Sequence, residues 1–399
     1  MDPQPITPIT ISGRYFFRGH ERFFVNGVVY RPLDPEGDPI DPLSHEHLPI
    51  LERCMPLFKE LALNTLYIFY LDETKNHDAA MSMLAEAGIY VLPCIAWTRY
   101  DRSFENKDAI MRCYFQAVDA MAKYPNTLGI ILSYELIISI VKTTLAPLLR
   151  GAVRDVKRYI RLLAKKKDQR VIPVGITAKD MSPLLKLQFD YFSSEPASDA
   201  IDFFTFNNFG WSSRSTLSES GYETLLGMFA ATPIPVFFSM YGSNTSHPRS
   251  FHETMTIYKD LDMVKIFSGG IVFEFFETAR EHGLIQLELY PETDEFNLIK
   301  LYDFLSLHRS LRFSFMKLPS FFSNSLWNEF KGSRPQQPKP SIYWMADRMV
   351  PKSLLRWDDI EAGIDDSEWV DVANDIGELT QNDLLDSVWE NVNVDDIEP

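Results

Sequence analysis

Residues 64–95 have the sequence NTLYIFYLDETKNHDAAMSMLAEAGIYVLPCI, in which two apolar runs flank an amphipathic stretch. The runs at 64–70 and 89–95 have the length and composition of strands that are buried on both faces. Between them, residues 78–87 have a helical pattern that stops at Gly88, and glycine is common just after a helix. The stretch therefore predicts a strand–helix–strand unit of a parallel sheet.

The same pattern recurs along most of the chain. Apolar runs that suit buried strands also occur at 23–30, 127–132, 170–176, 201–207, 234–238 and 270–275, which makes eight predicted strands. The units extend from Phe23 to about Glu277, close to the roughly 250 residues of a typical barrel. The sequence therefore predicts an α/β fold, a (β/α)8 TIM barrel. An open doubly wound sheet is the alternative, but no Gly-rich phosphate loop follows any predicted strand.

The composition changes after the barrel. We expect residues 1–315 to hold the barrel and a trailing helix at 297–311, and residues 316–357 to form a linker with the Pro-rich stretch KGSRPQQPKPS. Residues 358–399 hold 15 Asp and Glu and no Lys or Arg. Of the chain's 55 acidic and 39 basic residues, 40 acidic and all 39 basic ones therefore lie before residue 358, where the chain is nearly neutral. Residues 358–399 predict an acidic, disordered tail, which either is simply solvated or folds on a protein partner.

Composition and charge exclude several classes of protein. The chain is 45% hydrophobic and can bury a large core, while its net charge of −16 disfavours general binding to nucleic acid. It shows no signal peptide, no apolar run that could span a bilayer and no lipid-anchor signal. We therefore expect a cytoplasmic protein as the sequence is written, although a misplaced start would change this.

We expect no metal and no cofactor. The three cysteines are too few and too irregularly spaced for a zinc site or a disulfide framework. The His45-Glu46-His47 segment lies in a Pro-rich stretch without a paired motif, which is more typical of a surface loop than of a metal site.

The active site of a barrel of this kind lies at the carboxyl ends of the strands. There the fourth predicted strand is followed by Tyr134 and Glu135, the seventh by SMYGSN at 239–244, and the eighth contains Glu274. Retaining glycosidases use two carboxylates about 5–5.5 Å apart, one as acid/base and one as nucleophile. Here one strand end carries an acid, and the other carries the thioether of Met240.

Segments in and around these strands resemble one known family, glycoside hydrolase family 72, the fungal β-1,3-glucanosyltransferases of the cell wall. The similar segments are PITISGRYFF, RFFVNGVVYRP, FKELALNTLYIFYLDETKNHDAAMSMLAEAGIYVL, AKYPNTLGIILSYE, VIPVGITA, DFFTFNNFGW, PVFFSMYGSN and FSGGIVFEFFE, in this order. The resemblance implies a (β/α)8 barrel, a β-1,3-glucan substrate and an enzyme that cleaves one glucan chain and transfers it to another.

The resemblance also implies roles for single residues. Glu135 matches the family's acid/base Glu, although Tyr134 replaces the Asn that normally precedes it. Met240 matches the nucleophile Glu of the family's Ser-Glu-Tyr-Gly-Cys motif. Arg31 replaces a Gln, Tyr67 and Phe69 replace an Arg and a Tyr, and Phe273 and Phe275 replace tyrosines. The candidate substrate-binding residues are Arg31, Tyr67, Tyr134, Asn207, Trp211, Tyr241 and Glu274.

Cysteine positions of the family have changed as well. Ala80, Ser212 and Ser243 stand where the family has cysteines, and Cys54 lacks the partner that the resemblance implies. Secreted barrels would lose about 2–5 kcal/mol with each missing bridge, whereas a protein in a reducing compartment would lose nothing. These replacements favour a protein that is no longer exported.

Three functional hypotheses remain open at this point. In the first, the barrel is catalytically inactive because methionine can form no glycosyl ester, and it binds β-1,3-glucan or another protein. In the second, it is an active glycosidase or transglycosylase with altered chemistry centred on Glu135. In the third, it is a scaffold that acts through its acidic tail. Glu135 and Glu274 could equally be structural carboxylates of the barrel mouth.

Overall fold

The computed structural model describes residues 6–34, 36–95, 107–180, 183–212, 214–245, 249, 251–290, 295–301, 333–346, 349–353, 355, 357–358 and 360–361. Eight parallel strands form its centre: β4 (Val25–Val29), β5 (Thr65–Ile68), β6 (Tyr90–Pro93), β7 (Ile130–Tyr134), β8 (Val174–Lys179), β9 (Phe203–Asn207), β10 (Val236–Tyr241) and β11 (Gly269–Val272). They are hydrogen-bonded in the order β6-β5-β4-β11-β10-β9-β8-β7. Parallel bridges Val91↔Thr127 and Cys94↔Ile131 join the two outer strands, so the sheet closes on itself. The predicted (β/α)8 barrel is confirmed.

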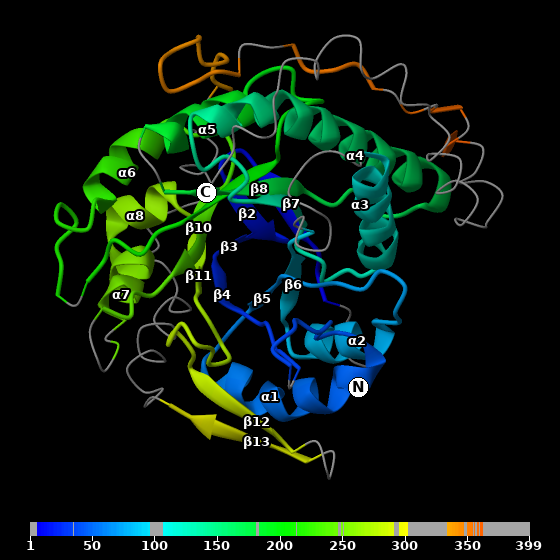
Figure 1. Cartoon of the computed structure of the whole chain (residues 1–399), viewed down its shortest axis with the longest axis vertical. Coiled ribbons are helices and arrows are strands. Elements are labelled where there is room, and N and C mark those ends of the chain that lie inside the picture. Colours follow the sequence, from blue (N-terminus) through cyan, green and yellow to red (C-terminus); the bar gives the residue numbers. More distant parts are fainter. Residues whose placement is uncertain are drawn as a thin grey trace.

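Helices surround the strands on the outside (Figure 1). They are α1 (Leu48–Glu60), α2 (Asp78–Glu86), α3 (Lys107–Ala122), α4 (Ala146–Lys167), α5 (Leu184–Ser193), α6 (Tyr222–Phe229), α7 (His252–Lys259) and α8 (Leu261–Ile266), with short 3-10 helices η1 (His45–His47) and η3 (Val141–Leu145). The longest, α4, has a proline in its first turn, three lysines in its last turn and Asp168 in the left-handed conformation at its end. These features suit the two ends of a helix, because proline needs no hydrogen-bond acceptor there and cations complement the carboxyl end of the dipole.

Alternation of side chains along the strands separates two buried layers. Phe203, Phe237 and Met240 belong to the inner cluster, which fills the barrel. Their neighbours Phe204, Phe238 and Tyr241 belong to the outer cluster, between strands and helices. Successive residues of a strand point to opposite faces, and one extra residue exchanges interior and exterior. In β10 the register shifts between Phe238 and Met240, so Met240 faces the interior although it lies three residues after Phe237.

A small antiparallel sheet, which the sequence analysis did not predict, closes the amino-terminal end of the barrel. It consists of β1 (Ile9–Ser12), β2 (Tyr15–Arg18) and β3 (Glu21–Phe23). Phe16 of β2 packs edge-on against Phe203 and Phe237, with ring centroids 5.9 and 6.0 Å apart. Both partners lie near the first residues of their strands. The carboxyl ends of the strands therefore remain for a functional site.

The prediction of a trailing helix at 297–311 is wrong for residues 297–300, which lie in a strand. Its first residues belong to β13 (Glu295–Lys300), which pairs in antiparallel fashion with β12 (Ile285–Tyr290). Leu287 and Leu298 lie opposite each other and pack against the outer core, so the hairpin buries apolar surface that a lone helix start would not. Residues 302–311 lie outside the described part of the chain.

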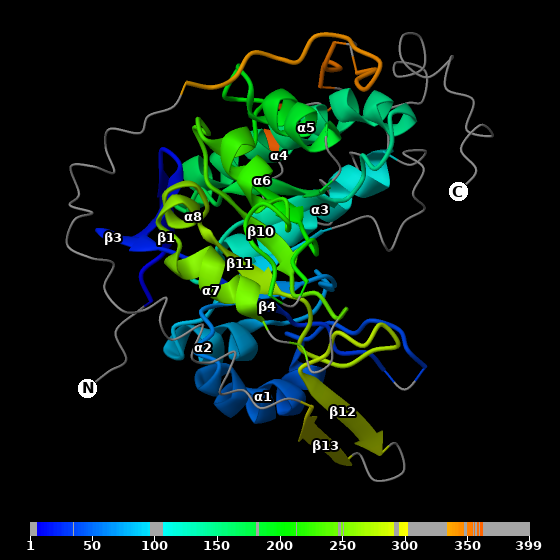
Figure 2. The ribbon, with the colours of Figure 1, turned by 90° about the vertical axis from the view of Figure 1, so that its left-hand side faces the viewer.

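The described part of the predicted linker runs along the outside of the barrel and packs on it. Trp344 is buried against Tyr191, with ring centroids 5.1 Å apart. Arg154 of α4 donates a 2.6 Å hydrogen bond to the carbonyl of Pro351, and Arg158 lies over the ring of Trp357 at 4.2 Å. Figure 2 shows this segment in orange beside α4 and α5. Residues 362–399, which make up most of the predicted acidic tail, lie outside the described residues.

The packing around Gly175 of β8 gives a stability test. An added Cβ would lie 2.3 Å from the ring of Phe203, and that ring is held between Phe16 and Phe237. We expect Gly175→Ala to lower the free energy of unfolding by about 1–3 kcal/mol through overpacking. The control Gly227→Ala, in α6 with nothing within 4 Å of the new Cβ, should raise it by up to about 1 kcal/mol. Urea unfolding checks both variants; equal effects would contradict the packing described here.

Glu253 of α7 gives a test that depends on pH. Its side chain is buried, and this burial raises the pKa of its carboxyl group from 4.5 to about 7. The folded protein then holds a proton that the unfolded chain releases, so this contribution to stability is complete below about pH 4.5 and is lost as the pH rises through 7. We expect Glu253→Gln to remove a loss of about 3 kcal/mol between these limits.

The measurement is the unfolding free energy of wild type and variant at pH 4.5, 6 and 8. The exposed Glu223, in the first turn of α6, provides the control variant Glu223→Gln. A wild-type-minus-variant difference that stays constant with pH would show that Glu253 does not titrate in this way.

Candidate active site at the carboxyl ends of the barrel strands

Glu135 directly follows β7 and has a strained backbone. Its φ of 46° lies in the left-handed region, which costs a non-glycine residue about 1–2 kcal/mol. Its backbone N–H donates a 2.8 Å hydrogen bond to the carbonyl of Thr177 in β8, which fixes the turn against the neighbouring strand. The side chain is partly exposed. The structure therefore holds one carboxylate at the open end of the barrel.

Asn207, the last residue of β9, connects the polar groups of this end. Its Nδ2 donates to the hydroxyl of Tyr134 and to Oε1 of Glu135, both at 2.9 Å. Its Oδ1 accepts a 2.7 Å hydrogen bond from the hydroxyl of Ser239 in β10. The predicted site residues Tyr134, Glu135 and Asn207 are thus brought together from the ends of β7 and β9, the two strands on either side of β8.

Met240 of β10 is the last member of this hydrogen-bond network. It lies in β10, is 1% exposed and belongs to the inner cluster. The hydroxyl of Tyr134 donates to its Sδ at 3.5 Å. Burial, followed by the charge of Glu135, raises the pKa of Tyr134, so this hydroxyl stays protonated and can donate. A thioether is a weak acceptor without charge, so this position offers neither a nucleophilic oxygen nor a negative charge.

The second carboxylate of the site, Glu274, is fully occupied. It is completely buried after β11, and Arg31, which follows β4, reaches both of its oxygens, the shorter contact being 2.8 Å. Thr278 donates a further hydrogen bond at 3.1 Å. Burial raises the pKa of Glu274, and the positive charge of Arg31 opposes this effect. Glu274 therefore serves as the partner of Arg31 and presents no free oxygen to a substrate.

Aromatic rings separate these two groups. Phe69 lies edge-on to Tyr134 with ring centroids 5.0 Å apart, and Arg31 lies over the ring of Phe69 at 5.8 Å. Tyr67 of β5 is deeper: it is fully buried, and its hydroxyl lies 3.3 Å from that of Thr177. Tyr67 thus closes the floor beneath the site and is shielded from a ligand by Phe69 and Tyr134.

Two predicted substrate-binding residues lie elsewhere. Tyr241 points to the helix side of β10, where it is fully buried and its hydroxyl accepts a hydrogen bond from Thr254 of α7 at 3.3 Å. Trp211 is also buried in the outer cluster, against Tyr222 of α6. The register shift in β10 turns Met240 to the interior and Tyr241 to the helix side, so the structure does not place the ring of Tyr241 at the site. Trp211, which lies beyond the end of β9, is buried on the helix side as well.

The sequence analysis missed Phe209 and His282. Phe209 is 39% exposed at the rim, and its ring lies edge-on to Phe273 and to His282, at 5.9 and 5.7 Å. A signal was present, because Phe209 lies only two residues beyond the end of β9, among residues that line the mouth of a barrel. His282 carries no such signal, since it lies in the loop before β12.

Metal-binding groups and membrane-spanning helices are both absent from the described residues. No group of His, Cys, Asp or Glu in that part of the chain is arranged to hold a metal ion. Among the described helices, none is both long enough and apolar enough to cross a membrane.

Comparison with known proteins identifies a matching family and several similar proteins. A model of the glucanosyltransferase family matches residues 3–311. The 1,3-beta-glucanosyltransferase gel1 of Aspergillus fumigatus is 32% identical over 347 residues, which cover 86% of this chain and 73% of that protein. The 1,3-beta-glucanosyltransferase GAS5 of Saccharomyces cerevisiae is 33% identical over 289 residues, covering 70% and 58% of the two chains.

Solved structures agree with these relatives. A variant of Saccharomyces cerevisiae Gas2p in complex with laminaritetraose and laminaripentaose is 29% identical, with a TM-score of 0.73 and coverage of 87% of this chain and 75% of that one. ScGas2 in complex with a numbered compound reaches a TM-score of 0.78 at 28% identity, covering 90% and 80%.

The pairing of Arg31 with Glu274 can be tested by a double-mutant cycle. Their side chains are 25% and 0% exposed, so water screens them little. We expect a coupling energy of about 1–3 kcal/mol from Arg31→Met and Glu274→Gln, measured by urea unfolding. The same cycle on the exposed pair Lys265 and Asp262, 46% and 71% exposed, should give about 0.5 kcal/mol or less. Equal coupling in both cycles would refute the assignment of Glu274 as a buried ion-pair partner.

Proposed function

The chain belongs to the glucanosyltransferase family, glycoside hydrolase family 72, and from this we propose that its barrel binds β-1,3-glucan chains without transferring them. The site of binding is the carboxyl end of the strands, around Glu135, Asn207 and Phe209. The laminari-oligosaccharide complex of the related Gas2p supports this ligand class.

One observation carries the proposal: a buried methionine sulfur occupies the position that the family motif gives to the nucleophile. Double displacement requires a carboxylate that attacks the anomeric carbon and holds the sugar as an ester. Met240 has no such oxygen, and its sulfur already accepts the hydrogen bond of Tyr134. Loss of one member of a coupled catalytic set costs on the order of 10⁴–10⁶ in rate.

The other carboxylates do not compensate. Glu274 is held by Arg31 and Thr278 and is completely buried. Glu135 remains at the acid/base position, where its Oε1 accepts from Asn207. An acid/base residue without an opposing nucleophile or activated water leaves the glycosidic bond intact. Glu135 is then available to accept hydrogen bonds from sugar hydroxyl groups.

The remaining surface of the site suits a sugar. Partly exposed Glu135 and Tyr134 offer hydrogen-bonding atoms, and the exposed ring of Phe209 provides an apolar face of the kind on which sugar rings stack. Such a combination of an apolar wall with a few placed polar groups is typical of small-molecule sites.

The direct test is calorimetric titration with laminaripentaose, followed by chromatography of the same mixture. We expect saturable binding and no shortened or lengthened oligosaccharide between pH 4 and pH 8. Phe209→Ala should weaken binding by about fivefold or more through loss of stacking. The matched control Tyr343→Ala removes a similarly exposed ring, 43% against 39%, far along the chain and should bind as wild type. New products, or the absence of binding, would overturn the proposal.

Restoring the missing charge gives a second test. We expect the double variant Met240→Glu, Tyr134→Asn to show transfer of laminari-oligosaccharides at least about 100-fold above wild type, because a carboxylate then replaces the sulfur. Met240→Gln with Tyr134→Asn, which has the same shape without the charge, is the control and should stay inactive. Adding Glu135→Gln to the active variant should abolish transfer. A gain in the uncharged control would show that the charge at position 240 is not what the site lacks.

A further inference from the structure

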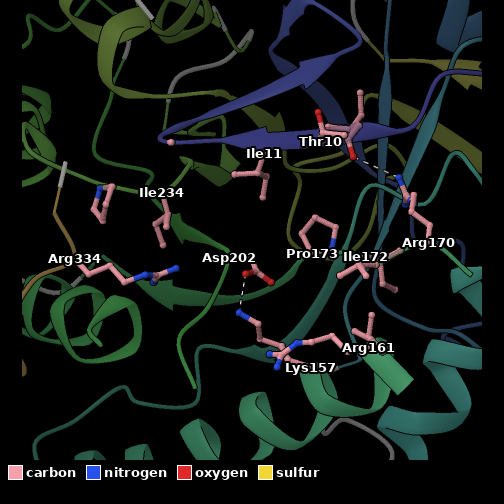
Figure 3. A pocket seen from close by; sticks show the side chains of 15 residues that line it. Thr10, Ile11, Lys157, Arg161, Arg170, Ile172, Pro173, Asp202, Ile234 and Arg334 are labelled. Atoms are coloured by element: carbon pink, nitrogen blue, oxygen red, sulfur yellow. Dashed lines mark hydrogen bonds and ion pairs between the residues drawn. The ribbon is translucent and has the colours of Figure 1, made fainter. Parts of the chain in front are cut away.

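A cavity lies at the amino-terminal end of the barrel, opposite the site around Glu135. Its volume is about 530 Å³, within the range of pockets that hold small molecules. Its lining includes Pro173 and Asp202, which precede β8 and β9, together with Ile9 and Ile11 of β1 and several residues of α4. Figure 3 shows this pocket with the strand starts on one side and α4 on the other. It is separate from the site around Glu135.

Positive charge dominates this amino-terminal pocket. Its described lining residues include Lys157, Arg161, Arg170 and Arg334, with Asp202 as the one carboxylate among them. Arg334 and Arg170 lie on opposite sides of the pocket, with Lys157 and Arg161 of α4 between them (Figure 3).

Intramolecular partners satisfy these cations only in part. Lys157 donates to Asp202 and to the carbonyl of Ala200 at 2.7 Å, and to the carbonyl of Ala197 at 3.2 Å, so its three N–H groups are paired. Arg334 donates a 2.9 Å hydrogen bond to the carbonyl of Ser193 and lies 3.8 Å from the exposed carboxylate of Glu195. Within the described residues, Arg161 has one hydrogen-bond acceptor, the carbonyl of Ser198 at 3.5 Å. Arg170 donates to the backbone carbonyls of Ile9 and Thr127, which carry no charge, and its buried Nε has no partner in the described part of the chain.

Burial makes this arrangement costly. It lowers the pKa of Arg170 to about 10 and lowers the pKa of Lys157, although Asp202 opposes the second effect. Arg170 remains protonated at neutral pH, and among the described residues it donates only to uncharged carbonyls, so its buried charge has no carboxylate partner there. A bound anion would supply the missing counter-charge.

We propose that the amino-terminal pocket binds a small organic phosphate, with the phosphate held by the guanidinium groups of Arg161 and Arg334 and the carbon skeleton against the isoleucines. A guanidinium group can donate two parallel hydrogen bonds to the oxygens of a phosphate. A phosphate also has more oxygens and more negative charge than a carboxylate, so it can pair with several cations at once. Ile9, Ile11, Ile160, Ile172 and Ile234 supply an aliphatic wall. The pocket contains no aromatic ring among its described lining residues, so the skeleton is aliphatic rather than a stacked base.

The test uses n-butyl phosphate and inorganic phosphate as probes, titrated calorimetrically into the full chain. We expect n-butyl phosphate to bind saturably and at least about fourfold more tightly than inorganic phosphate, because each buried methylene adds about 0.8 kcal/mol, or fourfold. Arg161→Glu should weaken binding at least about tenfold. Lys165→Ala removes an exposed cation of the same helix that does not line the pocket, and should leave binding unchanged.

Specific results would overturn the proposal. These are no saturable binding of either phosphate, equal binding by wild type and Arg161→Glu, or equal affinity for the two probes, which would remove the aliphatic wall from the site. Vesicles with phosphatidic acid distinguish the source of the phosphate: sedimentation of wild type but not of Arg161→Glu would identify a lipid headgroup. Laminaripentaose binding in the Arg161→Glu variant should be unchanged, so failure here is distinguishable from failure of the glucan proposal.

Discussion

The hydrogen bond from the Tyr134 hydroxyl to the sulfur of Met240 joins β7 to β10 at the open end of the barrel. The side-chain amide of Asn207 bonds to Tyr134 and also to Glu135 and Ser239, so one amide holds three residues at the strand ends. The network is satisfied without a negative charge at position 240. The absence of a negative charge on the Met240 side chain is the constraint on which the proposed function depends, because retaining glycosyl transfer needs a carboxylate nucleophile.

The other side of the site is balanced in the same way. Glu274 is completely buried, and Arg31 provides the counter-charge that makes its burial tolerable. Arg31 stands where the resemblance to the family implies a neutral Gln. By the same resemblance, the thioether of Met240 stands where the family has a carboxylate, while Glu135 matches the acid/base Glu. The proposed function rests on this arrangement of polar groups and aromatic rings at the carboxyl ends of the strands.

Apolar runs were sufficient to predict all eight barrel strands, because strands buried on both faces leave a strong local signal. The ends were less accurate: the predicted fifth strand began at Arg170, whereas β8 begins at Val174, after Pro173, which cannot donate to a ladder. Tyr134, Glu135 and Met240 were found from their positions at strand ends, and Asn207 from the family resemblance. Tyr241 was misplaced because the register shift in β10, between Phe238 and Met240, leaves no signal in the sequence. The pocket at the amino-terminal end depends on contacts between distant segments, which no local pattern records.

We propose that neither Glu135 nor Glu274, the two carboxylates described at the site, forms a covalent bond to the anomeric carbon of a glucan. Intact-protein mass spectrometry after incubation with a 2-deoxy-2-fluoro β-laminaribiosyl fluoride tests it most directly, since this reagent accumulates as a glycosyl ester on retaining enzymes. The account predicts an unchanged protein mass. A mass increase of one glycosyl unit, located on any Asp or Glu of the chain, would contradict it.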